Sequence, residues 1–91
     1  MALEKHFAKI IMDDLDDAEM IYGYADQAKK DRDMEASAFF MSRAKKRMSE
    51  FQEDLVHANK RMKGEVWDTY TDFVHDKAEQ IQHKLDKFTM Q

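Results

Sequence analysis

The chain has 91 residues, of which 37% are charged and 43% hydrophobic, with a formal net charge of −4 and no cysteine. This length gives one domain with one core and buries only roughly 60–65% of the surface that the unfolded chain exposes, so a partner chain would add stability. The absence of cysteine excludes disulfides, thiolate metal sites and cysteine nucleophiles.

Turn-forming residues are rare, because proline is absent and glycine occurs only twice, at Gly23 and Gly64. Strands and hairpins need such residues at their ends. Apolar residues instead recur at helical spacing through three segments, about 3–30, 33–63 and 66–89. Short connections make neighbouring helices antiparallel. We therefore predict an all-α fold, an antiparallel bundle of three long helices in a single domain over residues 1–91, open to completion by dimerisation.

The first predicted helix, about 3–30, carries an apolar stripe of Ala8, Ile11, Leu15, Ala18, Tyr22 and Ala25. A neighbouring row widens this face enough to touch two other helices, and it consists of Leu3, Phe7, Ile10, Ile21 and Ala28. Asp14 and Asp17 interrupt the second row. We expect both at the edge of the face, in contact with water. The alternative is a carboxylate placed inside the bundle for a purpose.

A turn is expected within residues 29–33, although no glycine or proline occurs there and one continuous helix is the alternative. Asp31 and Asp33 can each cap a following helix, and Glu35 adds negative charge to its first turn. The apolar stripe also changes its heptad phase across this segment. Both features favour a chain that doubles back.

The second predicted helix, about 33–63, has an unbroken 3-4 stripe of Met34, Ser37, Met41, Ala44, Met48, Phe51, Leu55, Ala58 and Met62. This spacing is typical of a coiled-coil-like seam, and the flexible methionines make that seam adaptable. We expect the helix to end at Gly64, with Lys60, Arg61 and Lys63 in its last turn, where basic residues favour the helix dipole.

The third predicted helix, about 66–89, presents Trp67, Tyr70, Val74, Ala78, Ile81, Leu85 and Phe88 on one face. The whole chain holds ten aromatic residues and eight methionines, more apolar side chains than a three-helix core needs. We predict an interaction surface formed by Tyr24, Trp67, Tyr70 and Phe73. The alternative is that these side chains fill the core.

Charge is uneven along the chain, since residues 1–30 and 65–91 are richer in acids and residues 31–64 are richer in bases. Folding the first helix back on the second brings a set of acids level with a set of bases, Asp13, Asp14, Asp16, Asp17 and Glu19 with Arg43, Lys45, Lys46 and Arg47. Each exposed pair contributes only a few tenths of a kcal/mol, but together they favour the antiparallel register. They also neutralise the basic cluster, so we do not expect nucleic-acid binding.

Metal binding needs consideration, because carboxylates and histidines on long helices build di-metal bundles. Asp54 and Glu53 lie three and four residues before His57, so either pair can meet one ion. Leu55 faces the seam, however, which turns Glu53 and His57 outward. A second set, His75, Glu79 and His83, lies along the third helix at four-residue steps, without an enclosing layer of partners. We expect solvated surface residues at both places.

Two segments, Asp17-Ala18-Glu19-Met20-Ile21-Tyr22 and Phe40 with Ala44 four residues on, resemble the first two helices of ferritin-like and rubrerythrin-like proteins. That superfamily has an inward glutamate on its first helix and Phe-x₃-Ala-x₂-Glu-x₂-His on its second. Glu19 matches the first ligand, but Arg47 and Glu50 occupy the Glu-x-x-His positions. The resemblance covers about residues 13–58. It implies a hairpin that dimerises into a four-helix core and has lost its di-iron site, with Arg47 paired to Glu19 instead.

The sequence contains no glycine-rich loop and no complete catalytic set, so we predict a non-enzymatic, cytoplasmic helical-bundle protein without a cofactor. It would act through self-association, as a dimer, or through another protein. No apolar run approaches the roughly 20 residues of a membrane span, and we expect no membrane partner. The alternative is a ferritin-like half-bundle completed in a dimer, which holds iron, manganese or zinc with Glu19, Glu50, Asp54 and His57 of each chain.

Overall fold

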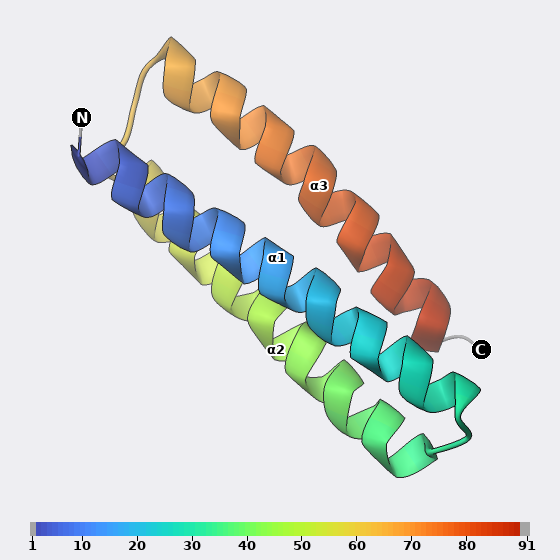
Figure 1. The fold of residues 1–91 in the computed structure, drawn as a ribbon. Coiled ribbons are helices and arrows are strands. Elements are labelled where there is room, and N and C mark those ends of the chain that lie inside the picture. Colours follow the sequence, from blue (N-terminus) through green and yellow to red (C-terminus); the bar gives the residue numbers. More distant parts are fainter. Residues whose placement is uncertain (1, 90–91) are drawn as a thin grey trace.

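The structure, a computed structural model, describes residues 2–89, with side chains from residue 4 onward. This part of the chain forms three helices and no strand, α1 (Ala2–Lys30), α2 (Met34–Asn59) and α3 (Glu65–Thr89). Helices that follow one another in the sequence run in opposite directions, and the Cα atoms extend over 47 × 19 × 15 Å (Figure 1). The predicted antiparallel three-helix bundle is therefore confirmed. The side chain of Leu3 lies outside the described residues.

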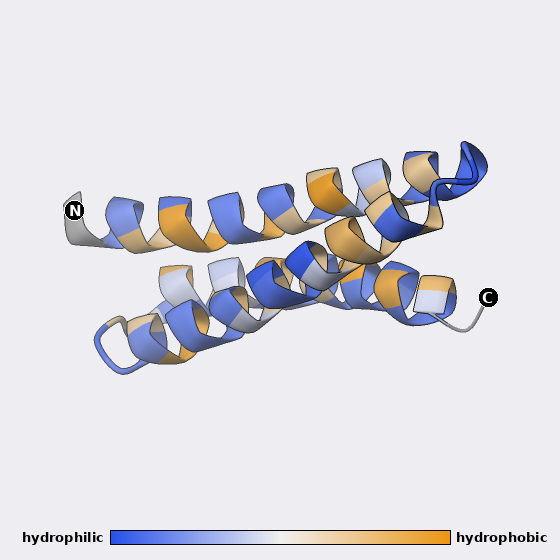
Figure 2. Cartoon of the chain, turned by 90° about the horizontal axis from the view of Figure 1, so that it is seen from below, coloured by the Kyte–Doolittle hydropathy of each residue, from blue (hydrophilic) through white to orange (hydrophobic). Residues whose placement is uncertain are grey.

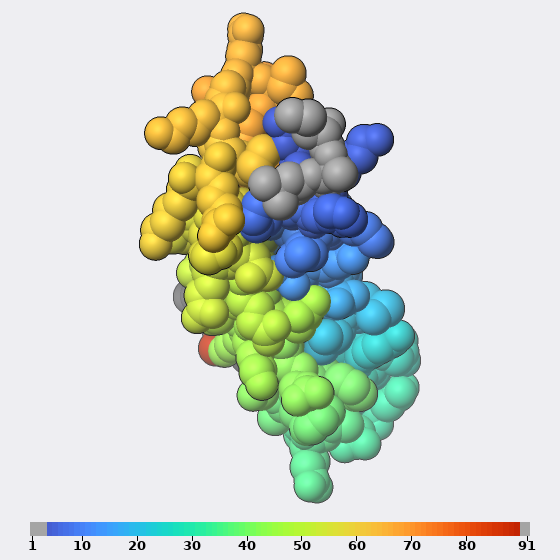
Figure 3. All heavy atoms as spheres, turned by 90° about the vertical axis from the view of Figure 1, so that its left-hand side faces the viewer, coloured from blue at the N-terminus to red at the C-terminus, as the bar shows by residue number. Residues whose placement is uncertain are grey.

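The hairpin of α1 and α2 is the best-packed part of the bundle, and the two helices lie side by side along their length (Figure 3). Four alanines on the facing sides are fully buried, Ala18, Ala25, Ala44 and Ala58. Their small side chains let the two backbones approach closely, while larger residues such as Leu15 and Phe51 fill the space between them. The predicted stripes of the first two helices thus meet in one core.

Ser37, the polar member of the predicted seam, is buried as the stripe requires. Its hydroxyl donates a hydrogen bond of 3.0 Å to the carbonyl oxygen of Ala25 on α1. Because a buried hydroxyl without a partner is costly, this bond lets serine occupy an apolar position.

Two apolar residues of the predicted faces lie in solvent instead. Met34 is 60% exposed, because no other helix covers the first turn of α2 on that side. Ile10 is half exposed on the side of α1 that neither α2 nor α3 covers.

The expected turn between the first two helices is confirmed at Asp31–Asp33. The amides of Arg32 and Asp33 donate to the carbonyls of Lys29 and Ala28, which is the Schellman pattern at a helix end. Arg32 adopts a left-handed backbone with φ of 63°. Asp33, not Asp31, caps α2, since its Oδ1 accepts a bond of 3.0 Å from the amide of Ala36.

The second helix ends at Asn59, earlier than the predicted residue 63, so that prediction was wrong. Trp67 Nε1 donates a hydrogen bond of 2.7 Å to Asn59 Oδ1, and Met62 is buried. These contacts fix the position of the connecting segment directly after α2. Lys60 is the C-cap, and Arg61 and Lys63 lie beyond the last turn instead of within it.

Gly64 has a φ of 120° and precedes α3 instead of closing α2. Its carbonyl accepts the bond from the amide of Asp68, the first bond of α3. The glycine was therefore a correct sign of a break, but it belongs to the start of the next helix.

The third helix is attached mainly at its ends and through ion pairs to α1, and it touches α2 least. Tyr70 Oη donates 2.6 Å to the carbonyl of Ala8, while Phe88 packs edge-on against Tyr22 at 5.8 Å between ring centroids. Figure 1 shows α3 running alongside α1, and Figure 2 shows hydrophilic residues along much of all three helices. This uneven packing leaves hollows between α2 and α3 beside the buried seam.

Candidate functional site

The first candidate site is a group of charged residues between α1 and α2, which we call the carboxylate cluster. It consists of the carboxylates of Asp14, Asp17 and Glu50, which pair with the guanidinium of Arg47, and of the carboxyl of Asp54, which adjoins Asp14. Arg47 Nη2 lies 2.9 Å from Asp14 Oδ1 and 2.8 Å from Asp17 Oδ2, and its Nη1 lies 2.7 Å from Glu50 Oε2. One cation therefore joins the two helices through three carboxylates.

Asp14 contradicts the expectation that it would lie at the edge of its face in water, since the residue is only 4% exposed. It follows Ile11 by three residues and precedes Ala18 by four, and both of these are fully buried. Position 14 therefore points into the seam. That spacing was the signal in the sequence that could have identified it. Asp17 is half exposed, as expected of an edge position.

The second oxygen of Asp14, Oδ2, is buried and has no hydrogen-bond donor facing it. Burial raises the pKa of Asp14 to about 7, and the adjacent carboxyl of Asp54 adds to the rise through a shared hydrogen bond and its negative charge, while Arg47 opposes it. Two carboxyls with no donor between them can form a hydrogen bond only if one carries a proton. The pair thus favours one bound proton near neutral pH.

Arg47 itself stays charged. Burial alone would lower its pKa, but the negative charges of Asp14, Asp17 and Glu50 raise it overall. The guanidinium is therefore a permanent positive charge within the hairpin.

The four predicted metal ligands do not gather around one point. Glu19 pairs with Lys84 of α3 at 3.2 Å and not with Arg47, so the expected Arg47–Glu19 pair was wrong. Glu19 belongs to the side of α1 that faces α3, whereas Asp14 belongs to the side that faces α2. Glu50 pairs with Arg47, Asp54 adjoins Asp14, and His57 is exposed with its ring 6.4 Å from that of Phe7.

Among residues 4–89, no group of three or more histidines and carboxylates is arranged to hold a metal ion. The guanidinium of Arg47 occupies the position among the carboxylates where a cation would bind. Within one chain, the residues present therefore do not fit a di-metal centre.

Two of the four residues predicted for an interaction surface belong to the core instead. Trp67 is 7% exposed and donates to Asn59, and Tyr70 is half-buried and donates to the carbonyl of Ala8. Burial raises the pKa of the Tyr70 hydroxyl. The prediction was wrong for these two, because both polar atoms find partners where the start of α3 meets α1 and the end of α2.

Tyr24 and Phe73 are exposed as predicted. Tyr24 lies on α1 beside Phe40, with ring centroids 5.6 Å apart, and Phe40 contacts Phe39 on α2. Phe73 lies on α3. The four residues therefore do not form one patch.

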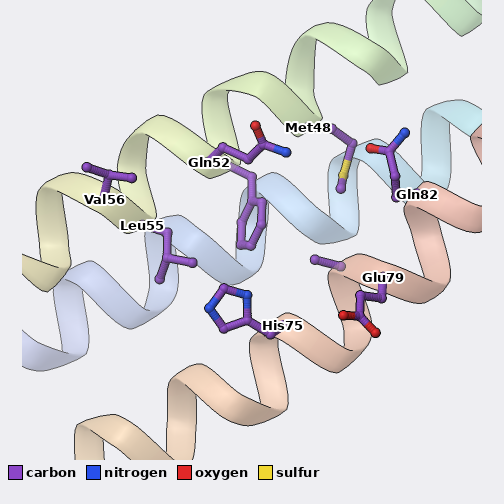
Figure 4. A pocket seen from close by; sticks show the side chains of 9 residues that line it. Met48, Gln52, Leu55, Val56, His75, Glu79 and Gln82 are labelled. Atoms are coloured by element: carbon purple, nitrogen blue, oxygen red, sulfur yellow. The ribbon is translucent and has the colours of Figure 1, made fainter.

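The second candidate site is a hollow of about 450 Å³ between α2 and α3, which the sequence did not reveal. It is lined by Met48, Phe51, Gln52, Leu55 and Val56 of α2 and by His75, Ala78, Glu79 and Gln82 of α3. Figure 4 shows α2 and α3 on its two sides with α1 behind. Its inner walls are the apolar seam and its rims are polar.

A further hollow of about 500 Å³ lies between α2 and the end of α3, with Lys29 of α1 also in its lining, and its α2 side is formed by Met34, Ser37, Ala38, Met41, Ser42 and Lys45. Phe88 and Thr89 stand on the α3 side. We call the two hollows together the α2–α3 groove. The groove therefore runs along the methionine-rich seam, whose residues Met41, Met48 and Phe51 form its buried floor at 3–6% exposure.

Comparisons with protein-family models, with curated proteins and with solved structures each gave no match. In the part of the chain that the structure describes, no helix combines the length and the apolar character needed to cross a membrane.

Proposed function

We propose that this protein is a non-enzymatic helical interaction module that binds a second copy of itself through the α2–α3 groove. The observation that carries the proposal is the apolar hollow beside the α2 seam, with the exposed Val56 among its lining residues. Met48, Phe51 and Leu55 belong to the core, yet they also line a hollow that reaches solvent. An apolar strip of this kind with polar rims is typical of a helix-packing interface.

Val56 shows that the groove is more than a gap in the core. It is an apolar residue of α2 that is 57% exposed, and it lines the groove beside Gln52. A partner helix laid along the groove would cover Val56 together with the deeper seam residues. Methionine side chains adapt well to such a partner.

Charge complementarity favours a second copy as the partner. Four of the exposed acids of α3 recur at seven-residue steps, which places them along one side of the helix, and they are Glu65, Asp72, Glu79 and Asp86. Glu79 itself lines the groove. The α2 residues that line either hollow include Lys45 and no acid. One chain therefore carries an acid on the α3 side of the groove and a lysine on the α2 side, and a two-fold symmetric interface can bring such opposite charges together.

The test is the molar mass in solution, measured by sedimentation equilibrium and by light scattering over a wide concentration range. We expect a dimer for the natural chain and a monomer for Val56→Glu, because the added carboxylate would be buried against an apolar partner. Helix content should stay unchanged, since Val56 is exposed within one chain.

The matched control is Val66→Glu, the same change at a residue that is 82% exposed at the start of α3 and outside the groove. It should remain a dimer. A natural chain that is monomeric at every concentration, or equal effects of the two substitutions, would show that the groove does not bind a second copy.

The metal-binding alternative, a ferritin-like half-bundle completed in a dimer, has one observation in its favour, the buried Asp14 Oδ2 without a donor beside Asp54. Arg47 already neutralises this cluster, so we expect no stoichiometric iron, manganese or zinc in protein purified without a histidine tag. Stoichiometric metal that is lost in Glu19→Ala would replace the interaction module as the proposed function.

A further inference from the structure

We infer that the two copies pair about a two-fold axis parallel to the helices, so that α2 of each copy packs against α3 of the other. This inference rests on the self-association proposed above and adds the arrangement of the partners. It follows from the charges along the groove and from the heights at which they lie.

Two symmetric arrangements bring the grooves of two copies face to face. An axis parallel to the helices places α2 over α3 of the partner subunit and keeps every residue at its own height. An axis across the helices places α2 over the partner's α2 and α3 over the partner's α3, with their ends exchanged. Facing helices are antiparallel in both cases, so helix direction does not choose between them.

The row of acids on α3 that includes the groove-lining Glu79 distinguishes the two arrangements. An axis across the helices would lay Glu65, Asp72, Glu79 and Asp86 against the same four acids of the partner subunit. Like charges brought together at an interface cost several kcal/mol in total. An axis parallel to the helices instead lays these acids against the rim of α2, where the lining residues include Lys45 and no acid.

The heights of Lys45 and Asp86 make the pairing specific. Met48 of α2 and Gln82 of α3 line the same hollow. Lys45 is three residues before Met48, and Asp86 is four residues after Gln82. Because the helices are antiparallel, both steps lead about one turn, roughly 5 Å, in the same direction.

Lys45 and Asp86 therefore stand at similar heights on opposite rims. A two-fold axis parallel to the helices preserves height and exchanges the rims, so Lys45 faces Asp86 of the partner subunit, and the contact occurs twice in the dimer. Gln82 Nε2 donates 2.9 Å to Asp86 Oδ1, which directs that carboxylate along the side of the helix that lines the groove.

The test is charge reversal at each position, followed by mixing. Lys45→Glu and Asp86→Lys should each weaken the homodimer, raising its dissociation constant roughly tenfold or more, because each homodimer then contains two like-charge contacts. An equimolar mixture should recover the affinity of the natural dimer. In the mixed dimer the new carboxylate at position 45 faces the new ammonium at position 86, and the other contact is unchanged.

Lys46→Glu is the matched control, because it reverses the same charge one residue away from Lys45. Lys46 lines a different hollow, on the α1–α2 side, together with Arg43 and Arg47. It should dimerise like the natural chain. Circular dichroism checks that all variants keep their helix content.

If Lys45→Glu and Asp86→Lys dimerise normally, or if their mixture is no tighter than the separate variants, this arrangement is wrong. Self-association through the groove would still stand in that case, provided that Val56→Glu is monomeric. A monomeric natural chain would overturn the arrangement and the proposed function together.

Discussion

At the scale of single residues, Asp14 has the most unusual environment in the described chain. Its pKa is raised from the ordinary 3.8 to about 7, so the folded chain keeps a proton that the unfolded chain releases. The stabilisation from that proton is complete below the unfolded pKa, near 4, and is lost as the pH rises through about 7. Asp14 therefore makes the free energy of unfolding fall between about pH 4 and pH 7.

The substitution Asp14→Asn tests this assignment. An asparagine amide is neutral at every pH, and it can accept from Arg47 with its oxygen and donate to Asp54 with its nitrogen. We expect the free energy of unfolding at pH 8 to rise by about 1 kcal/mol, and the pH dependence between pH 5 and pH 8 to become flatter. Denaturant unfolding at both pH values measures the two effects.

Asp13→Asn is the control for that experiment, since Asp13 makes only an exposed pair with Lys9 at 3.3 Å. Exposed pairs of this kind contribute little, so the pH profile should not change. An Asp14→Asn profile as steep as that of the natural chain would refute the proton held between Asp14 and Asp54.

The environment of Asp14 could be read from the sequence only in part. Helical spacing places position 14 between Ile11 and Ala18 and therefore in the seam. The partners that make its burial tolerable, Arg47 and Asp54, come from the other helix, and the spacing within one helix does not show which of its charges will meet them. The same limit explains why the sequence led us to expect a Glu19–Arg47 pair, whereas in the structure Glu19 pairs with Lys84.

At the scale of helices and turns, the connection between α1 and α2 contains a residue whose side chain disfavours the backbone conformation found there. Arg32 has a φ of 63°, the left-handed conformation that glycine adopts at least cost. Arg32→Gly should therefore raise the free energy of unfolding by about 0.5–1 kcal/mol, despite the greater freedom of glycine in the unfolded chain. Thermal and denaturant unfolding measure the change.

Gly64→Ala is the opposite control. Gly64 has a φ of 120°, which strains any residue with a Cβ, although no heavy atom would lie within 4 Å of that Cβ. We expect a loss of about 1 kcal/mol or more. If Arg32→Gly lowered stability instead, side-chain contacts of Arg32 would have to outweigh the backbone strain.

Helix positions were largely predictable, and helix ends less so. The cap at Asp33 and the change of stripe phase located the first turn correctly. The end of α2 depends on Trp67 reaching back to Asn59, a contact between two helices that neither local sequence contains. For the same reason, Trp67 and Tyr70 could not be assigned to core or surface before the path of α3 was known.

At the scale of the whole molecule, the seam periodicity correctly predicted which side of each helix is buried, but it could not predict how completely a neighbour would cover it. The α1–α2 hairpin closes tightly because buried alanines face each other. α3 leans toward α1 through Lys77–Asp16 and Lys84–Glu19, ion pairs at 2.7 and 3.2 Å. The groove beside α2 results from this difference in packing, because α3 is held mainly by α1 and covers α2 less completely.

A dimer that closes this groove links folding to association, and that link is measurable in the natural chain. Because a second copy binds only the folded state, the midpoint of thermal unfolding should rise with protein concentration, by about 3–4 °C for each tenfold increase. Val56→Glu should show no such rise, whereas Val66→Glu should behave like the natural chain. Differential scanning calorimetry over two decades of concentration measures the shift. A midpoint that is independent of concentration in the natural chain would mean that one copy alone is the folded unit and that the groove stays open in it.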